Sequence, residues 1–363
     1  MWGNVKPRSG RTTSSLVGSG LAGDLAGFVL HADGFVGGRH LVGDRVRRHQ
    51  SLAPTRCGEC TSCDTLPWRP DGVHGGADVD NVRMSRDRPA PEPPQPLSPL
   101  IDAHTHLDAC GASDASSVRQ MVDRAADVGV ERVVTVADDL DAAKFAVDAA
   151  NWDPRVYAAV AIHPTRANVL GDANKAEIER LAGDPRVVAV GETGLDFYWP
   201  GKLDGCATVA EQTAGFRWHI DLAKRLGKTL MIHNREADRA LLQVLREEGA
   251  PETVIFHCFS SDAEMARECI DAGYVLSFSG TVSFKNAKAL REAAPLVPAD
   301  QLIVETDAPF LTPHPFRGAP NEPYCLPYTV RALAELRGES PTELAIASTA
   351  TAERVFGLRS VRS

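Results

Sequence analysis

The residues best suited to chemistry are four histidines and two carboxylates that stand at the ends of short apolar runs. They are His104, His106, Glu192, His233, His257 and Asp307. His104 and His106 are two residues apart, and in a strand this spacing directs both imidazoles to one side, where they can bind the same ion. Imidazole nitrogens with carboxylate oxygens suit Zn²⁺ and also Mn²⁺. Six ligands exceed the four of a tetrahedral zinc, so the set predicts two ions about 3.5–4 Å apart.

Each residue of this set also has a purely structural interpretation. A lone histidine at a strand end more often makes a hydrogen bond than binds a metal. Asp307 before Ala-Pro could cap a helix, and Glu192 before Thr-Gly could be an exposed loop acid. Six such placements at five strand ends are improbable by chance, and together they favour a metal centre.

These side chains must be positioned by an alternation of strands and helices that begins near residue 98. The expected strands are Leu100–Ala103, Arg132–Val136, Val156–Ile162, Val187–Gly191, Thr229–Ile232, Thr253–His257, Tyr274–Phe278 and Leu302–Glu305. The expected helices include Ser116–Val128, Ala142–Asn151, Lys175–Leu181, Val209–Leu226, Ala237–Glu248, Ala263–Ala272 and Ala287–Ala294. Uniformly apolar strands indicate a parallel sheet covered on both faces, and the repeats predict an α/β fold, a (β/α)₈ TIM barrel, with an open doubly wound sheet as the alternative. A barrel would gather the six residues at the carboxyl rim of its strands.

Residues 1–97 differ in composition from residues 98–363, which we expect to form the barrel. The first segment contains 14 of the 30 glycines and ends in a proline-rich run. Such a segment buries too little apolar surface to offset its ordering entropy, so we expect a largely disordered extension. Met84 offers an alternative translation start, in which case residues 1–83 would be absent from the native protein.

The cysteines raise a second hypothesis, of a different class. Cys57, Cys60 and Cys63 have the spacing of metal ligands, and a fourth ligand could come only from His49 or His74. An N-terminal module that binds zinc or a cluster is therefore an alternative source of function. The other five of the eight cysteines are scattered singly, which fits reduced and mostly buried thiols better than a disulfide framework.

Charge and hydropathy limit the partners. The formal net charge of −9 argues against tight non-specific binding along a duplex, which needs many contacts between basic side chains and phosphates. A nucleic-acid substrate remains compatible, because two divalent ions would supply about four positive charges where a phosphate must sit. No apolar run approaches the roughly 18 residues that span a bilayer, and the N-terminus lacks a secretory pattern. We expect a cytoplasmic protein with no membrane partner, and a monomer by default.

Seven motifs occur in order along the barrel segment. They are Ile101–Asp108 (IDAHTHLD), Val190–Asp196 (VGETGLD), Ile232–Arg235 (IHNR), Phe256–Ser260 (FHCFS), Phe278–Asn286 (FSGTVSFKN), Glu305–Pro309 (ETDAP) and Arg317–Pro323 (RGAPNEP). By these motifs, which cover about residues 99–357, the chain resembles the TatD family of metal-dependent deoxyribonucleases, within the amidohydrolase-type barrels. The resemblance implies a DNase that cleaves phosphodiester bonds, with 3′→5′ exonuclease activity on DNA that is single-stranded or has free 3′ ends.

The resemblance also implies how the ligands divide between two divalent ions per subunit, which could be Mg²⁺, Mn²⁺ or Zn²⁺. Glu192 would bridge the two ions. One ion would be held by His104, His106 and Asp307, and the other by His233 and His257. His163 matches the family histidine that faces the substrate phosphate.

The residues themselves suggest a mechanism for this centre. Hydrolysis would proceed by in-line attack of a metal-activated water on phosphorus. Asp307 is the best candidate for the general base, because a carboxylate ligand can also accept a proton. Arg235 could help His163 to orient the phosphate, or could instead pair with Glu236 or another acid. Phe197, Tyr198 and Trp199 could offer stacking faces to an unpaired base, or could instead pack against the barrel.

Some positions depart from the family pattern, and other functions stay open. Val160-Ala-Ile-His163 lacks a glycine that is common there, and Thr349-Ala-Thr lacks the usual asparagine. The loop 197–208 is also distinctive and leaves substrate preference open. A related barrel acting on an amide or lactone is the nearest rival, although such enzymes often bridge their ions with a modified lysine where this chain has Glu192. An inactive barrel that serves as a scaffold is a further alternative.

Overall fold

Eight parallel strands follow one another around the sheet in chain order, from β1 to β8. The computed structural model describes residues 88–358. The strands are β1 (Leu100–Thr105), β2 (Val130–Val136), β3 (Val156–Val160), β4 (Val187–Asp196), β5 (Thr229–Arg235), β6 (Val254–Phe256), β7 (Val275–Phe278) and β8 (Leu302–Val304). This order confirms the predicted barrel and excludes the doubly wound sheet, in which the strand order reverses partway across.

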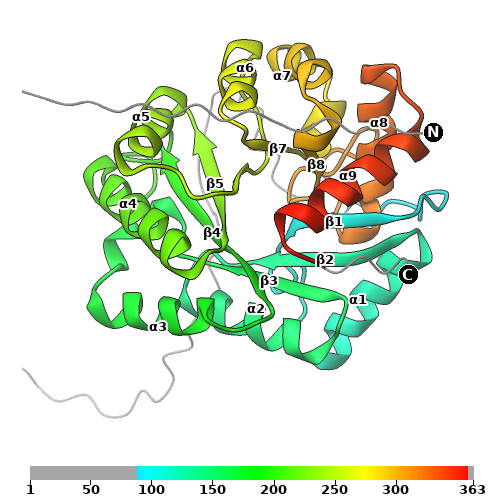
Figure 1. The fold of residues 1–363 in the computed structure, drawn as a ribbon. Coiled ribbons are helices and arrows are strands. Elements are labelled where there is room, and N and C mark those ends of the chain that lie inside the picture. The colour runs from blue at the N-terminus through cyan, green and yellow to red at the C-terminus, as the bar shows by residue number, and fades with distance from the viewer. Residues whose placement is uncertain (1–87, 359–363) are drawn as a thin grey trace, which may run out of the picture. The chain divides into compact units, whose positions relative to one another are not determined.

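Helices follow the strands and surround the sheet (Figure 1). They are α1 (Ala115–Asp127), α2 (Leu140–Trp152), α3 (Asp172–Ala182), α4 (Val209–Leu226), α5 (Asp238–Glu248), α6 (Ala263–Asp271), α7 (Lys288–Ala293), α8 (Leu326–Arg337) and α9 (Pro341–Val355). Local signals set their ends: Thr208 and Glu211 form a capping box at the start of α4, and Gly227 ends it in the left-handed conformation. No helix among residues 88–358 is long and apolar enough to cross a bilayer.

Two of the strands that carry the site, β4 and β5, extend further than the apolar pattern predicts, whereas β6 and β8 end one residue earlier than predicted. β4 continues to Asp196 and β5 to Arg235, and these two residues are paired in register. The expected ends were Gly191 and Ile232, where the apolar runs stop. Polar residues continue the strands because main-chain hydrogen bonds, rather than burial of apolar side chains, maintain the pairing near the rim.

The barrel interior is filled by side chains from every strand. The buried cluster includes Ile101, Val134, Ala159, Ala189, Met231, Ile255, Val275 and Ile303. Val355 and Phe356, at the end of α9, belong to the same cluster. Thr349 Oγ1, on α9, donates to the carbonyl oxygen of Pro99 just before β1. Helix α9 therefore covers the end of the barrel at which the strands begin, which leaves the opposite rim for chemistry.

The seam between β8 and β1 closes at the carboxyl rim. Thr105 and Ala308 form an isolated parallel bridge. The amide of His106 donates to the carbonyl oxygen of Ala308 over 2.7 Å, and the amide of Asp307 donates to that of His104 over 2.9 Å. The main chain around the predicted ligands therefore joins the first and last strands.

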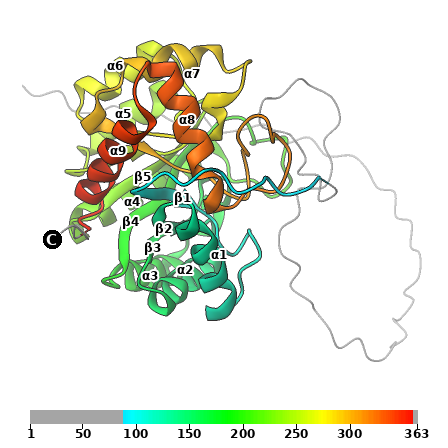
Figure 2. The ribbon, with the colours of Figure 1, turned by 90° about the vertical axis from the view of Figure 1, so that its right-hand side faces the viewer.

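Residues 88–97 form an extended segment that lies against α8, as the cyan trace in Figure 2 shows. Pro91, Pro94 and Leu97 are buried while the residues between them are exposed, and this three-residue period is typical of a polyproline II helix. Tyr324, Tyr328 and Arg331 donate side-chain hydrogen bonds to the carbonyl oxygens of Pro91, Glu92 and Gln95, respectively. We call residues 88–97 the N-terminal strap.

The strap differs from the expectation of disorder for residues 88–97. Its prolines cost little ordering entropy, because their φ angles are already fixed. Hydroxyl and guanidinium donors in and just before α8 also satisfy three of its carbonyl groups. The remainder of the predicted extension, including Met84 and the cysteine cluster at 57–63, lies outside the described residues.

Candidate metal centre

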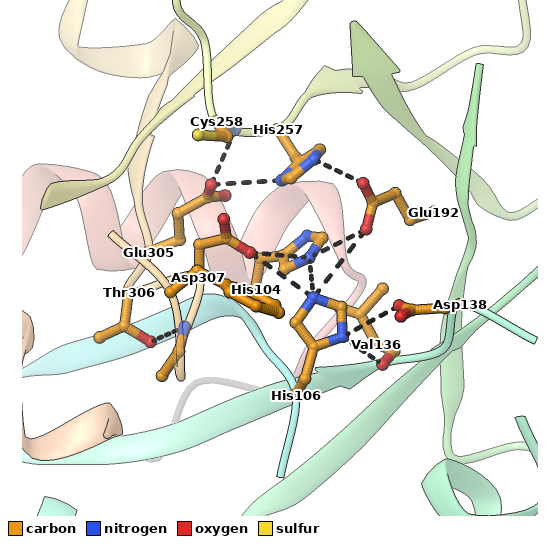
Figure 3. A network of polar contacts seen from close by, with 12 residues as sticks. His104, His106, Val136, Asp138, Glu192, His257, Cys258, Glu305, Thr306 and Asp307 are labelled. Carbon is orange, nitrogen blue, oxygen red and sulfur yellow. Dashed lines mark hydrogen bonds and ion pairs between the residues drawn. The ribbon is translucent and has the colours of Figure 1, made fainter. Parts of the chain in front are cut away.

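The six predicted ligands meet at the carboxyl rim of the barrel. His104 lies in β1, Glu192 in β4 and His233 in β5. His106 and His257 directly follow β1 and β6, and Asp307 comes three residues after the end of β8. All are buried except His233, which is half-buried. Figure 3 shows His104, His106, Glu192, His257 and Asp307 directed toward a common centre.

His104, His106 and Asp307 form one group of ligand atoms. The Nε2 atoms of the two histidines are 3.2 Å apart. Asp307 Oδ1 lies 3.6 Å from Nε2 of His104 and 3.5 Å from Nε2 of His106. These three atoms therefore surround one small volume, to which β1 and the residue directly after it contribute the two histidines.

The outer nitrogens of the two imidazoles show that this group fits a cation. His106 Nδ1 lies 3.0 Å from the carbonyl oxygen of Val136, and His104 Nδ1 lies 3.2 Å from the sulfur of Met231. Both partners are acceptors, so the neutral rings carry their protons on Nδ1. When both rings are neutral, two Nε2 lone pairs and a carboxylate oxygen face each other, and a cation, or in its absence a proton on His106, would compensate this repulsion.

The second group gathers around Glu192 Oε1. This oxygen lies 2.7 Å from His233 Nδ1 and 2.9 Å from His257 Nε2. The other oxygen, Oε2, lies 3.4 Å from His104 Nε2, in the first group. One carboxylate therefore faces both histidine pairs, an arrangement that allows it to bridge two ions.

Charge in this centre is distributed unevenly. Burial alone would raise the pKa of Glu192, but His257 and His104 outweigh it and hold that pKa well below its usual range. Burial and the nearby His257 lower the pKa of His104 to about 4. Burial also opposes charge on His106, yet Asp138 and Asp307 outweigh it and raise the pKa of His106 to about 10. The buried carboxylates therefore need nearby positive charge to compensate their own. Protons on some of the imidazoles, or bound cations, can supply it.

Two glycines allow β4 to approach β5 at the site. A Cβ on Gly191 would lie 2.5 Å from the Cβ of Met231. Gly194 has φ +146°, and a Cβ there would overlap the carbonyl oxygen of His233. The Gly-Glu-Thr-Gly sequence thus places Glu192 on a strand that larger residues would push away from β5.

Asp307 itself adopts a left-handed conformation, with φ +52°. Asp tolerates this region better than most residues with a Cβ. The hydrogen bond from its amide to His104 holds the main chain in place. The Thr306 amide and hydroxyl donate to the two carboxylate oxygens of the buried Asp102, over 2.8 and 2.5 Å. Contacts on both sides of the seam therefore fix the main chain from which the Asp307 side chain projects.

His163 lies within the ligand cluster. Its Nε2 is 3.3 Å from His233 Nδ1 and 3.5 Å from Glu192 Oε1. Its Nδ1 is 2.7 Å from the hydroxyl of Thr165. The side chain is half-buried, so it can reach both the second group of ligands and a substrate beside it.

Arg235 lies beside the aromatic residues of the loop after β4. Its guanidinium carbon is 4.0 Å from the ring centre of Tyr198 and 5.3 Å from that of Trp199. Lys202 Nζ is 3.5 Å from the ring centre of Tyr198, and Phe197 packs against the barrel core. The ring of Tyr198 is therefore already in contact with two cations, which makes it a poor stacking face for a base.

Two buried acids beside the predicted ligands, Asp196 and Glu305, have no role predicted from the sequence. Asp196 Oδ2 lies 3.2 Å from His233 Nε2. Glu305 Oε1 lies 3.3 Å from His257 Nδ1 without hydrogen-bond alignment. Both acids belong to the motifs that carry ligands, at the ends of Gly-Glu-Thr-Gly-Leu-Asp196 and at the start of Glu305-Thr-Asp. Their closeness in sequence to a predicted ligand is the signal that could have identified them.

Known proteins share this fold and sequence. A family model described as "TatD related DNase" matches residues 101–357. The uncharacterized metal-dependent hydrolase TatD of Mycobacterium tuberculosis is 68% identical over 259 residues, covering 71% of this chain and 98% of the relative. The 3′-5′ ssDNA/RNA exonuclease TatD of Erwinia billingiae is 34% identical over 247 residues, covering 66% and 92%. The crystal structure of YJJV, a TatD homologue from Escherichia coli K12, superposes with a TM-score of 0.66 at 27% identity, covering 72% of this chain and 98% of that one.

Proposed function

The chain belongs to the TatD-related DNase family of metal-dependent hydrolases, and we propose that it is a 3′→5′ exonuclease that hydrolyses phosphodiester bonds in single-stranded DNA. Relatives named as 3′-5′ ssDNA/RNA exonucleases support this substrate class. The observation that carries the proposal is the position of Glu192, whose two carboxylate oxygens face different histidine pairs. A bridged pair of divalent ions is suited to an in-line displacement at phosphorus.

The two groups of atoms suggest how the ligands would divide between two ions. His104, His106 and Asp307 would hold one ion, His233 and His257 would hold the other, and Glu192 would contact both. When bound, the ions lower the pKa of water and neutralise the charge that builds on the phosphoryl oxygens. Mg²⁺, Mn²⁺ and Zn²⁺ are the candidate ions. The four histidines favour Mn²⁺ or Zn²⁺ over Mg²⁺, which prefers oxygen ligands.

Three side chains complete the reaction. Asp307 accepts the proton of the attacking water, since its carboxylate faces the first group of ligands and 11% of its side chain is exposed to the rim. His163 donates a hydrogen bond to a non-bridging phosphate oxygen. Arg235 lies at the same rim, on the side of the loop 197–208. It attracts the next phosphate along the DNA strand.

The experiment compares defined oligonucleotides with an amide and lactone panel. The purified protein is stripped with a chelator, reloaded with Mn²⁺ or Zn²⁺, and incubated with single-stranded DNA labelled at its 5′ end. Stepwise shortening from the 3′ end that stops in Glu192→Ala supports the proposal. Turnover of amides or lactones without cleavage of DNA or RNA would overturn it in favour of the rival barrel hydrolase. Metal-dependent cleavage of RNA alone would retain the phosphodiesterase chemistry and reject DNA as the substrate.

A further inference from the structure

Asp196 is a fully buried carboxylate at the carboxyl end of β4. Its Oδ2 lies 3.2 Å from His233 Nε2, while its Oδ1 accepts hydrogen bonds from the amides of Tyr198 and Trp199 over 2.9 and 3.0 Å. We propose that Asp196 is a positioning residue that fixes the tautomer of His233 for metal binding and ties this ligand to the turn at residues 198–199.

The tautomer follows from the partners of the two ring nitrogens. Asp196 is an acceptor, so Nε2 of a neutral His233 carries the proton and donates it to Oδ2. Nδ1 then keeps its lone pair, and this is the atom that lies 2.7 Å from Glu192 Oε1. A cation that binds between His233 and Glu192 needs this lone pair. Asp196 thus prepares the ring for its partner on the opposite side.

A role as a turn cap alone does not account for the acid. The turn uses only Oδ1, and a neutral asparagine could accept the same two amide hydrogen bonds. A buried carboxylate is costly unless its charge is compensated. His233 supplies the donor for its second oxygen, since Oδ2 lies 3.2 Å from the ring Nε2. The negative charge at this position is therefore explained by the histidine.

The same carboxylate joins the ligand to the substrate side of the rim. Gln212 Oε1 accepts the amide hydrogen of Asp196 over 2.8 Å and fixes its backbone to α4. The turn that Oδ1 caps places Tyr198 under the guanidinium of Arg235. The position of Arg235 and the orientation of His233 thus depend on one residue, so a change at Asp196 reaches both the metal and the phosphate that Arg235 would attract.

The test uses Asp196→Asn in the full-length chain. Asparagine keeps an oxygen for the turn but presents an amide N–H to His233 Nε2, which forces the ring proton onto Nδ1 and blocks coordination. Titration of the metal-free protein with Mn²⁺ or Zn²⁺ should show two ions in the wild type. In the variant, the affinity for one of the two should fall about 10- to 100-fold. Nitrogen-15 spectra of labelled histidine should show the His233 proton moving from Nε2 to Nδ1.

Two further variants separate the roles. Asp153→Asn is the matched control, because it changes a buried carboxylate at the end of the barrel where the strands begin, and its Oδ2 lies 2.7 Å from the Arg155 guanidinium. The affinity of this variant for both ions should stay within about threefold of wild type. That change is well below the 10- to 100-fold loss expected when an outer-shell partner sets a tautomer. Asp196→Ala should lose the turn as well, and faster hydrogen exchange of the Tyr198 and Trp199 amides should distinguish it from Asp196→Asn.

The inference rests on the proposed metal-dependent function, and the outcomes distinguish the two. If the wild type binds no divalent cation, the proposed function fails. If the wild type binds two ions and Asp196→Asn binds both with unchanged affinity and an unchanged His233 tautomer, only the role of Asp196 is overturned. Circular dichroism and the melting temperature of the metal-free variants show that they are folded, so a loss of binding reports on the site.

Discussion

The amide of Asp307 donates a hydrogen bond to the carbonyl oxygen of His104 over 2.9 Å, across the seam between the last and first strands. Both side chains belong to the same proposed ion site. The main chain therefore sets the separation of two ligands before any metal binds. This arrangement reduces the entropy that the site must lose on binding and makes ion affinity depend on closure of the barrel.

Thr306→Val tests this dependence. The Thr306 hydroxyl donates to Asp102 Oδ2 over 2.5 Å in a buried setting, and valine would leave that oxygen without its donor. We expect the free energy of unfolding to fall by about 1–3 kcal/mol, with weaker binding of the ion near Asp307. Urea denaturation and metal titration provide the measurements.

Thr351→Val is the matched control for this substitution. Thr351 Oγ1 donates to the carbonyl oxygen of Ala299 over 2.9 Å, near the opposite end of the barrel. Thr351→Val should lower the free energy of unfolding by about 0.5–1.5 kcal/mol without changing metal affinity. Equal effects of the two substitutions on metal binding would contradict a special role for the seam.

Metal binding should depend on pH. The pKa of His106 is about 10 in the metal-free site, because Asp138 and Asp307 outweigh the effect of burial, so its ring is protonated at pH 7. That proton must leave when a cation binds, and affinity should therefore rise as the pH rises from 6 to 8. Calorimetry in two buffers of different ionisation enthalpy measures the protons released. Binding without proton release would show that His106 is not a ligand.

Metal removal should lower the thermal stability of the protein. A ligand that binds only the folded state stabilises it by about 2.7 kcal/mol when present at 100 times its dissociation constant. The melting temperature should therefore rise with added Mn²⁺ or Zn²⁺ and return to its starting value with chelator. Glu192→Gln should abolish most of this rise, since both ion sites lose a shared carboxylate. An equal rise in wild type and variant would contradict the bridging role of Glu192.

His219 should make folding sensitive to mild acid. Burial lowers the pKa of this residue from 6.5 to about 4, and its neutral ring accepts the Ile162 amide hydrogen and lies 2.8 Å from the Gly215 carbonyl. Because the folded pKa is depressed, the unfolded chain takes up a proton first. Neutral His219 therefore contributes fully to the free energy of unfolding above pH 6.5. This contribution, about 3 kcal/mol, is lost as the pH falls toward 4.

His219→Gln isolates this effect. The substitution can itself change stability at pH 7. Between pH 7 and pH 4, however, the free energy of unfolding of the variant should fall by about 3 kcal/mol less than that of the wild type. Unfolding by urea at a series of pH values measures the difference. Parallel pH profiles for the two proteins would show that His219 does not titrate in this range.

The N-terminal strap should stabilise the barrel through buried hydrogen bonds. Tyr324→Phe leaves the Pro91 carbonyl without its donor at a buried position, and should cost about 1–2 kcal/mol. Tyr328→Phe removes the equivalent bond to Glu92 at an exposed position, where water can replace the hydroxyl, and should cost less than about 0.5 kcal/mol. The ratio of the two losses in chemical denaturation tests whether the strap is docked in solution.

The sequence by itself determined the barrel and the types of ligand. Apolar runs of strand length alternate with amphipathic helices, and this local pattern requires a parallel sheet covered by helices. Histidines and carboxylates at the ends of those runs then have to share one rim. His104, His106, Glu192 and Asp307 could therefore be predicted as ligands without knowing their distances.

Only the tertiary structure decided which atoms face each other. The two oxygens of Glu192 face different histidine pairs, Asp196 contacts the far nitrogen of His233, and residues 88–97 dock on α8. Local periodicity reports that a residue is buried, but it does not identify its partner. Partners far apart in the chain, such as Gln95 and Arg331, are brought together by closure of the barrel, and that closure is a property of the whole chain.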